Sequence, residues 1–200
     1  MKFADAIFEQ TFVYRLTQLP FAMKKLAPLM ACNDLQRARR VLDVGCGPGT
    51  NAALFAHADY IGVDINPRYI AWARRHYPGE FIVADVRFHE FPVDRSFDFV
   101  LVNSFFHHLT DQEVRRVLAA VARVVSSEGL VRVLDLVLPE KRSAARWLAR
   151  HDRGRHARSL EAWRKLFGAV FDVVAFEPYA VALLGVPLWH MVYCKGRPKL

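Results

Sequence analysis

Seven short stretches of the chain consist mainly of apolar residues, many of them β-branched or aromatic, which is typical of strands buried in a sheet. Segments with the apolar spacing of amphipathic helices lie between several of them, at residues 51–58, at residues 67–77 and from Thr110 onward. The predicted strands are residues 39–45, 60–64, 80–85, 97–104, 130–138, 171–181 and 188–196.

The order of these elements predicts an α/β fold. Pro67 stands in the first turn of one predicted helix, and Thr110 with Glu113 has the spacing of a capping box at the start of another. Strands that alternate with helices form parallel sheets that are covered on both faces. About six residues link the last two predicted strands, too few for a parallel crossover. We therefore expect an open seven-stranded sheet, mostly parallel with one antiparallel strand, and helices on both faces.

The first thirty residues have helical spacing but stand outside this alternation. Phe8, Phe12 and Leu16 fall on one helical face, and Pro20 and Pro28 interrupt the pattern. We expect residues 1–30 to form a helical cap. The remaining chain, residues 31–200, forms one domain that carries a basic insertion at residues 139–168.

Composition narrows the class of protein. The chain has 200 residues, of which 53% are hydrophobic and 24% are charged, so it is neither disordered nor of low complexity. Its first thirty residues carry scattered charges rather than the continuous apolar core of a secretory leader. Cys32, Cys46 and Cys194 are an odd, scattered set without a CxxC pair, which indicates a reducing cytoplasm and no zinc site. We expect a cytoplasmic protein without a metal.

The positive charge of the chain is concentrated in one segment. Residues 141–165 hold nine Lys or Arg and two acids, which accounts for +7 of the formal net charge of +8. A partner that recognises this charge must bind locally. RNA phosphates, anionic lipid headgroups at a membrane surface and an acidic small molecule all fit, as does a solvated helix face that binds nothing.

Candidate chemistry gathers where the predicted strands end, which is where open α/β sheets bind their ligands. The loop at residues 45–49 contains three glycines, which let a ligand approach the backbone closely. Asp64 ends the second strand and can accept hydrogen bonds from two ribose hydroxyls. Asp85 follows the third strand and can accept one from an adenine amino group. Residues 103–108 follow the fourth strand and contain two histidines.

The pattern of this loop is compatible with two kinds of nucleotide cofactor, a dinucleotide and S-adenosylmethionine. Residues 47–52 fit the dinucleotide pattern G-x-G-x-x-G/A, with Asp64 lying 17 positions after Gly47. Asp43, inside the first strand, argues against a dinucleotide because its carboxylate would repel a pyrophosphate. The ammonium and sulfonium groups of S-adenosylmethionine would instead be attracted by that carboxylate.

At these positions the sequence resembles the class I S-adenosylmethionine-dependent methyltransferases of the small-molecule branch. VLDVGCGPGTN, GVDINPRYI, VADV and FDFVLVNSFFHHLTDQE match the first four motifs of that family, and LAAVARVVSSEGLVRVLDL matches the helix and strand that follow. The resemblance covers Arg40 to about Asp135 and implies a Rossmann-like fold with an antiparallel seventh strand. One departure is Arg132 inside the fifth predicted strand, which we expect to face a sheet edge or a helix.

The resemblance also implies how the cofactor would be held. The glycine loop would pack against the methionine part of S-adenosylmethionine, and Asp43 would meet its ammonium directly or through water. The acid after the second strand would hold the ribose, and Ile65 the adenine ring. Asp85 and Val86 would bind the adenine edge, and the backbone near Asn103 would accept from the ammonium. The implied cofactor-binding residues are Asp43, Gly45, Cys46, Gly47, Gly49, Asp64, Ile65, Asp85, Val86 and Asn103.

Methyl transfer depends on positioning, and an oxygen acceptor of high pKa also needs a base. His108 is the candidate catalytic base, because HHL at this position recurs in the family. His107 is the second candidate, and neighbours on an extended chain would point in opposite directions.

The acceptor is expected to be a small molecule, aromatic or lipid-like if the N-terminal cap lines its cavity. The fourth motif reads NSFF rather than the Asp/Asn-Pro-Pro-aromatic pattern of enzymes that methylate exocyclic amines of bases. RNA methylation through residues 141–165 and non-catalytic binding of a nucleotide cofactor remain alternatives.

Overall fold

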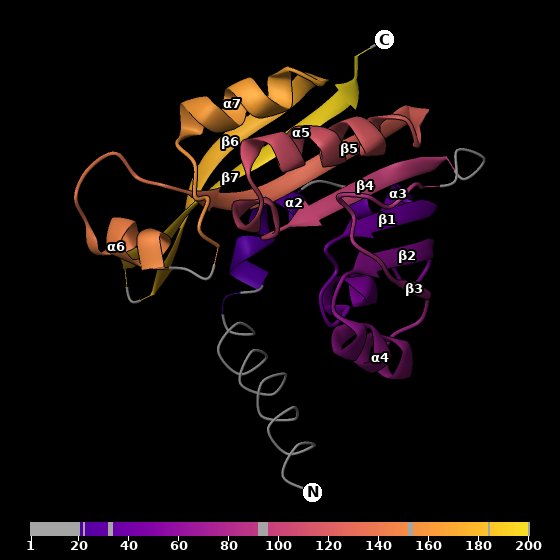
Figure 1. Ribbon diagram of the computed structural model, residues 1–200. Coiled ribbons are helices and arrows are strands. Elements are labelled where there is room, and N and C mark those ends of the chain that lie inside the picture. The colour runs from indigo at the N-terminus through magenta and orange to yellow at the C-terminus, as the bar shows by residue number, and fades with distance from the viewer. Residues whose placement is uncertain are drawn as a thin grey trace, which may run out of the picture.

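Seven strands form one sheet in the order β3-β2-β1-β4-β5-β7-β6 (Figure 1). The computed structural model describes residues 21, 23–31, 34–91, 96–151, 154–183 and 185–199. The strands are β1 (Arg40–Val44), β2 (Asp59–Asp64), β3 (Glu80–Val83), β4 (Phe97–Asn103), β5 (Val125–Val137), β6 (Phe171–Leu183) and β7 (Val186–Pro198).

The strand directions confirm the predicted α/β class. The pairs β1–β2, β1–β4, β2–β3 and β4–β5 are all parallel. Strand β7 lies between β5 and β6 and is antiparallel to both. The link between β6 and β7 is shorter than predicted, because both strands continue toward residues 184–185, and Gly185 there has a φ of 81°.

Two of the helices that cover the sheet begin where the sequence signals predict. Helix α4 (Pro67–His76) begins after Asn66, whose side chain accepts from the backbone N–H of Arg68 at 3.0 Å. Helix α5 (Asp111–Ala122) begins with the predicted capping box of Thr110 and Glu113. The helix predicted over residues 51–58 is a 3₁₀ helix, η1 (Thr50–Phe55). The other helices among the described residues are α2 (Ala27–Met30), α3 (Asp34–Arg37), η2 (Phe106–His108), α6 (Ala144–His151) and α7 (Leu160–Gly168).

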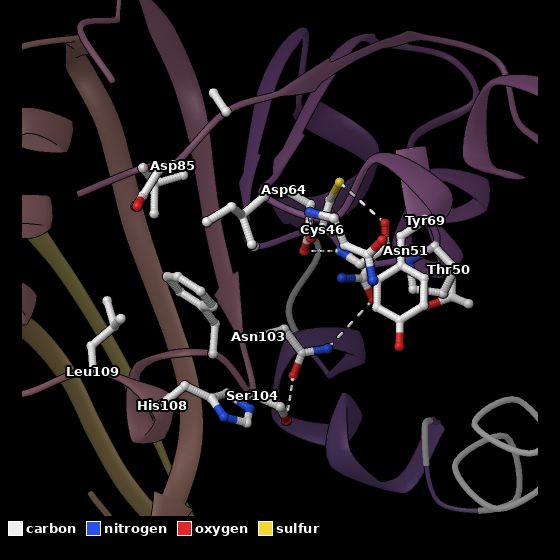
Figure 2. Close-up of a pocket in the computed structure, with 18 of the residues that line it drawn as sticks. Cys46, Thr50, Asn51, Asp64, Tyr69, Asp85, Asn103, Ser104, His108 and Leu109 are labelled. Carbon is white, nitrogen blue, oxygen red and sulfur yellow. Dashed lines mark hydrogen bonds between the residues drawn. The ribbon is translucent and has the colours of Figure 1, made fainter. Parts of the chain in front are cut away.

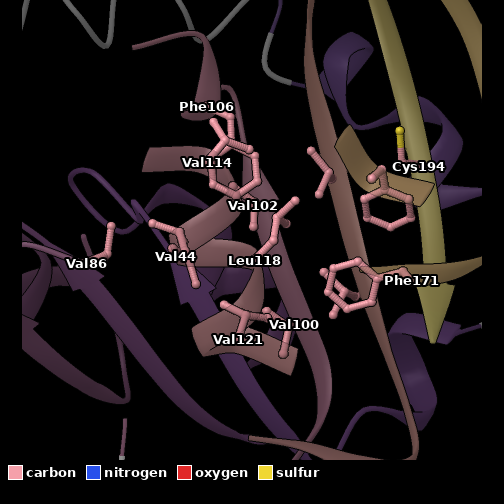
Figure 3. Packing of buried hydrophobic residues seen from close by; sticks show 14 of the residues in the cluster. Val44, Val86, Val100, Val102, Phe106, Val114, Leu118, Val121, Phe171 and Cys194 are labelled. Atoms are coloured by element: carbon pink, nitrogen blue, oxygen red, sulfur yellow. The ribbon is translucent and has the colours of Figure 1, made fainter. Parts of the chain in front are cut away.

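Buried side chains of the central strand β4 alternate between the two faces of the sheet. Val100 and Val102 pack on one face with α5, as Figure 3 shows. Phe99 and Leu101 pack on the other face with η1 and α4. A strand that is apolar on both faces must be covered on both, which is why its sequence lacks polar alternation. The parallel pairing of β1 with both β2 and β4 brings the carboxyl ends of the three strands beside one another.

Arg132 faces a helix, one of the two surroundings expected from its sequence position. Its side chain is 3% exposed and lies 3.7 Å from the centroid of the Phe99 ring. The guanidinium donates to Asp34 of α3 at 2.9 Å, and Lys195 of β7 pairs with the same carboxylate. The three charges fasten α3 to the sheet.

The segment expected as a basic insertion contains two helices. Helix α6 packs against β7, whereas α7 buries Trp163, Leu166 and Phe167. The predicted cap falls largely on residues 1–20, which lie outside the described residues. Within the part of the chain that the structure describes, no helix is long and apolar enough to cross a membrane.

Candidate active site

A cavity of about 520 Å³ opens where β1, β2 and β4 end, and most of the predicted site residues line it (Figure 2). Three of the predicted residues, Asp43, Gly49 and His107, do not line it. Those that do are Gly45, Cys46, Gly47, Asp64, Ile65, Asp85, Val86, Asn103 and His108.

The three glycines of the loop have different neighbours. A Cβ on Gly47 would meet nothing within 4 Å, so only this glycine opens onto free space. A Cβ on Gly45 would lie 2.5 Å from Cγ of Phe105, and one on Gly49 would lie 2.8 Å from Cβ of Ala73. All three have positive φ values, which L side chains rarely adopt. Internal packing therefore explains Gly45 and Gly49, whereas the positive φ favours glycine at Gly47 and leaves its backbone open to the close approach of a ligand.

Asp64 is held in place by the loop that it faces. Its Oδ2 accepts from the backbone N–H of Gly47 at 2.9 Å, and its Oδ1 accepts from the backbone N–H of Asn66 at 2.8 Å. Burial raises the pKa of this carboxyl, and the two N–H donors act against that shift. Both oxygens keep further lone pairs, so the carboxylate can still accept from a ligand in the cavity.

Asp43 lies beneath the loop, fully buried, instead of in the cavity wall. Its Oδ2 accepts from the Tyr60 hydroxyl at 2.5 Å and from the Asn51 amide at 3.0 Å. Burial raises its pKa to about 6, although those two hydrogen bonds lower it. Asn103 in turn donates to Asn51 at 3.4 Å, so a chain of polar groups runs from the buried acid to the cavity.

Asp85 lines the cavity but is already paired. Its carboxylate accepts from Nε and Nη2 of Arg87, the latter at 2.6 Å. Arg87 also pairs with Glu113 of α5 at 2.7 Å. The guanidinium lowers the pKa of Asp85, so this acid is a charged partner of Arg87. Its oxygens can accept further hydrogen bonds, and its contact with the adenine edge stays a prediction.

The two histidines lie in the 3₁₀ turn η2 rather than on an extended chain. Their ring centroids are 4.2 Å apart, so the expectation that they point in opposite directions was wrong. His108 is exposed and lines the cavity. His107 is 6% exposed, and its Nδ1 lies 2.6 Å from Oδ1 of Asp135 at the end of β5.

Asp135 is a buried acid that the sequence analysis did not single out. It accepts from the backbone N–H groups of Phe106 and Leu136, each at 2.6 Å. Burial alone would raise its pKa, but the imidazole of His107 and the two N–H donors hold the pKa below its usual value. An aspartate inside an apolar strand was the available signal, the same signal that drew attention to Asp43.

No role was assigned from the sequence to the other cavity residues, of which Lys25 and Arg87 also lie outside the quoted motifs. Lys25 reaches the cavity from the segment before α2, although it is more than eighty positions from the histidines in sequence. The remaining ones are Pro48, Thr50, Asn51, Asn66, Tyr69, Ala84, Arg87, Ser104, Phe105 and Leu109.

The donor set fits S-adenosylmethionine. Gly47 leaves open space above the loop, and Asp64 offers an anchored carboxylate there. Oδ1 of Asp43 is buried without a hydrogen-bond partner among the described residues, so a cationic group or a water nearby would satisfy it. Two carboxylates beside the loop are unfavourable for a pyrophosphate, which disfavours a dinucleotide.

Comparison with known sequences agrees with this chemistry. Residues 41–129 match the family model of a methyltransferase domain. A trans-aconitate 2-methyltransferase of Delftia acidovorans is 27% identical over 199 residues, which cover 88% of this chain and 71% of that protein. The uncharacterized methyltransferase YcgJ of Bacillus subtilis is 33% identical over 150 residues, 68% of this chain and 58% of that protein.

Solved structures share the fold. A protein of Pyrococcus horikoshii superposes with a TM-score of 0.70 at 23% identity, covering 89% of this chain and 90% of that one. Human N-acetylserotonin methyltransferase, solved in complex with S-adenosylmethionine, has a TM-score of 0.69 at 15% identity and covers 92% of this chain and 54% of its own. The motifs, the site and the match to the family model together identify residues 41–129 as a methyltransferase domain of the class I S-adenosylmethionine-dependent type.

Proposed function

We propose that this protein transfers the methyl group of S-adenosylmethionine to an acidic oxygen, a carboxylate or a phenolate, of a small molecule with an apolar skeleton. The observation that carries the proposal is the composition of the cavity. Among the lining residues, we assign Asp64 and Gly47 to a cofactor side, and Lys25, Phe105 and His108 to an acceptor side for an anion with an apolar body.

The cofactor side supplies fixed acceptors and open backbone. Asp64 is oriented by the N–H groups of Gly47 and Asn66, so it can receive two ribose hydroxyls without reorganising. Ile65 is exposed at 58% and offers an apolar surface for the adenine ring. Bound S-adenosylmethionine supplies a methyl group on a sulfonium, a good leaving group. The chain's own residues therefore have mainly to orient the acceptor.

The acceptor side has few polar groups. Lys25 attracts an anion, and His108 can either take a proton from a phenol or donate a hydrogen bond to a carboxylate. A carboxylate is ionised at neutral pH and needs no base, so His108 would then orient it. The Delftia relative is named for methyl transfer to trans-aconitate, an organic acid, which supports an acidic acceptor for this chain.

The first test concerns the cofactor. S-adenosylhomocysteine, S-adenosylmethionine and NAD are titrated calorimetrically into the protein, into the Asp64→Ala variant and into the Asp59→Ala variant. Asp59 begins the same strand at its opposite end, so it is the matched control. We expect both adenosyl ligands to bind the protein and its control, but neither to bind Asp64→Ala. Binding of NAD alone would contradict the proposal.

The second test concerns the acceptor. Transfer of a radiolabelled methyl group from S-adenosylmethionine is measured with aromatic and aliphatic carboxylic acids, with phenols and with RNA as acceptors. The neutral analogues are the amides of the acids and the methyl ethers of the phenols. We expect turnover with acids or phenols and none with the neutral analogues. Loss of label in mild alkali would identify a methyl ester, and retention an ether. Salt-sensitive transfer to RNA alone would instead favour the alternative function through residues 141–165.

A further inference from the structure

Part of the basic segment lies across the turn that carries the histidines. We call residues 154–158, between α6 and α7, the strap, and residues 105–109 the acceptor turn. The backbone N–H of His156 donates to the carbonyl of His107 at 3.0 Å. The carbonyl of Arg158 accepts from Leu138 at 2.7 Å, which ties the strap to the end of β5. The strap is therefore fixed to the sheet on one side and to the acceptor turn on the other.

Arg158 makes the densest set of these contacts. Its side chain is 5% exposed, although it belongs to the most basic part of the chain. Nη1 donates to the carbonyl of Phe106 at 2.8 Å, and Nη2 donates to the carbonyl of Leu109 at 2.5 Å. Nε pairs with Asp111 at the start of α5 at 2.7 Å. A planar guanidinium can bridge these acceptors at once, which the single ammonium of a lysine cannot do.

Gly154 packs directly against His107. A Cβ at Gly154 would collide with Cδ2 of the His107 ring and with the His107 backbone. On its other sides the same ring lies against His108, with a centroid separation of 4.2 Å, and contacts Asp135 through Nδ1. The His107 ring is thus held by a glycine, an aspartate and the ring of the candidate catalytic residue.

We propose that the strap is a positioning element for methyl transfer, in which Arg158 and Gly154 fix the acceptor turn, and with it the ring of His108 in the cavity. Neither residue lines the cavity, so each acts through the turn. The inference rests on the proposed function, because it assigns His108 to the acceptor. It also gives residues 154–158 of the basic segment a role other than binding an external anion. A displacement of about 1 Å at a reacting group can cost about 100-fold in rate.

Two pairs of variants test the strap. Gly154→Ala inserts a methyl group against His107, and Gly168→Ala is its control, since a Cβ at Gly168 would meet only one atom, at 3.9 Å. Arg158→Met removes the guanidinium, and Arg164→Met removes an exposed arginine of α7 that stacks on Phe176. Arg158→Lys tests partial rescue. The measurements are kcat and KM for the acceptor, calorimetric affinity for S-adenosylhomocysteine, and amide hydrogen exchange over residues 105–109.

We expect Gly154→Ala and Arg158→Met to lose about 10- to 100-fold in kcat while their affinity for S-adenosylhomocysteine stays within about twofold. Arg158→Lys should be intermediate, and both controls should match the unmodified protein. Exchange over the acceptor turn should accelerate about tenfold or more in Arg158→Met only. If Arg158→Met does not fold, Gly154→Ala decides, since it removes no hydrogen bond.

Two results would overturn the proposal that the strap positions the acceptor turn. One is an unchanged kcat in Gly154→Ala, and the other is a loss of affinity for S-adenosylhomocysteine in the strap variants as large as their loss of kcat. If the unmodified protein methylates no acceptor, the proposed function fails. The exchange measurement then decides on the strap by itself, because equal exchange in Arg158→Met and Arg164→Met would refute it.

Discussion

The replacement of Asp43 by asparagine should make the ligand-free protein more stable and its cofactor site weaker. The carboxyl group is fully buried and its pKa is raised to about 6, against 3.8 for an ordinary aspartate. The folded protein therefore holds this proton more tightly than the unfolded chain does, so stability falls as pH rises from about 4 to 6. A difference of about two pKa units corresponds to about 3 kcal/mol.

Asparagine has the same shape and cannot lose a proton in this range. Its amide oxygen can still accept from Tyr60 and Asn51 in place of Oδ2. We expect the free energy of unfolding of Asp43→Asn, relative to the unmodified protein, to increase by about 2 to 3 kcal/mol between pH 4 and pH 8. Urea unfolding of both proteins at a series of pH values measures this difference in unfolding free energy. The other carboxylates titrate in both proteins, so most of their contribution cancels when the two free energies are subtracted. Asp59→Asn serves as the control for the loss of a carboxylate at a strand end.

The affinity for S-adenosylhomocysteine should change in the opposite direction. The buried Oδ1 atom of Asp43 lacks a partner among the described residues, and a bound ammonium lowers the pKa of a nearby carboxylate. Calorimetry at pH 8 should therefore find weaker binding by Asp43→Asn than by the unmodified protein. A stability difference that does not vary with pH would refute the reasoning, because the carboxylate would then already be compensated in the ligand-free protein.

Three further predictions follow from single contacts of the site and the fold. Gly45→Ala should destabilise the protein by about 1 to 3 kcal/mol, because its Cβ would lie 2.5 Å from the Phe105 ring. The Cβ of Gly47→Ala would meet no atom within 4 Å, so this variant should weaken cofactor binding more than its modest backbone strain weakens the fold. Chemical denaturation measures the stability of both variants, and calorimetry measures their affinity for S-adenosylhomocysteine. His108→Ala should lower kcat with little change in affinity for S-adenosylhomocysteine. Full activity of this variant between about pH 6 and pH 9 would show that the ring has only a structural role. Asp34→Asn should cost about 3 kcal/mol in urea unfolding, because it leaves two part-buried or buried cations of the sheet without their carboxylate.

The sequence predicted the fold well because its signals are local. The apolar stretches indicate the strands, the capping box at Thr110 indicates the start of a helix, and the short link before β7 indicates an antiparallel pair. The order of the strands in the sheet was not predicted and comes from the structure. Whether a residue is buried beneath a loop depends on contacts with other elements, and no local sequence signal indicates it. Asp43 is only two positions before the cavity-lining Gly45, yet it accepts a hydrogen bond from Tyr60, which comes from the next strand. A strand end tells which edge of the sheet a residue occupies, but not whether its side chain faces the cavity or the core.

The same distinction explains the histidines. The pair HHL indicates that a ring is available, whereas the choice between His107 and His108 depends on partners distant in sequence. Asp135 is 28 positions away and the strap residue Gly154 is 47 positions away from His107. Pair partners at this separation carry no periodic pattern, so only the folded structure identifies which ring is buried and which one reaches the cavity.

The glycine loop and the acceptor turn are joined by direct packing, which links the two halves of the proposed site. Gly45 accommodates the ring of Phe105, the first residue of the acceptor turn, and Asn103 just before that turn bonds to Asn51 above the buried Asp43. A shift of the loop on ligand binding would therefore reach the turn through this contact with Phe105. Because the strap holds the far side of the same turn through Arg158, such a shift has little room to spread. A rigid turn between two anchors is what methyl transfer by positioning requires.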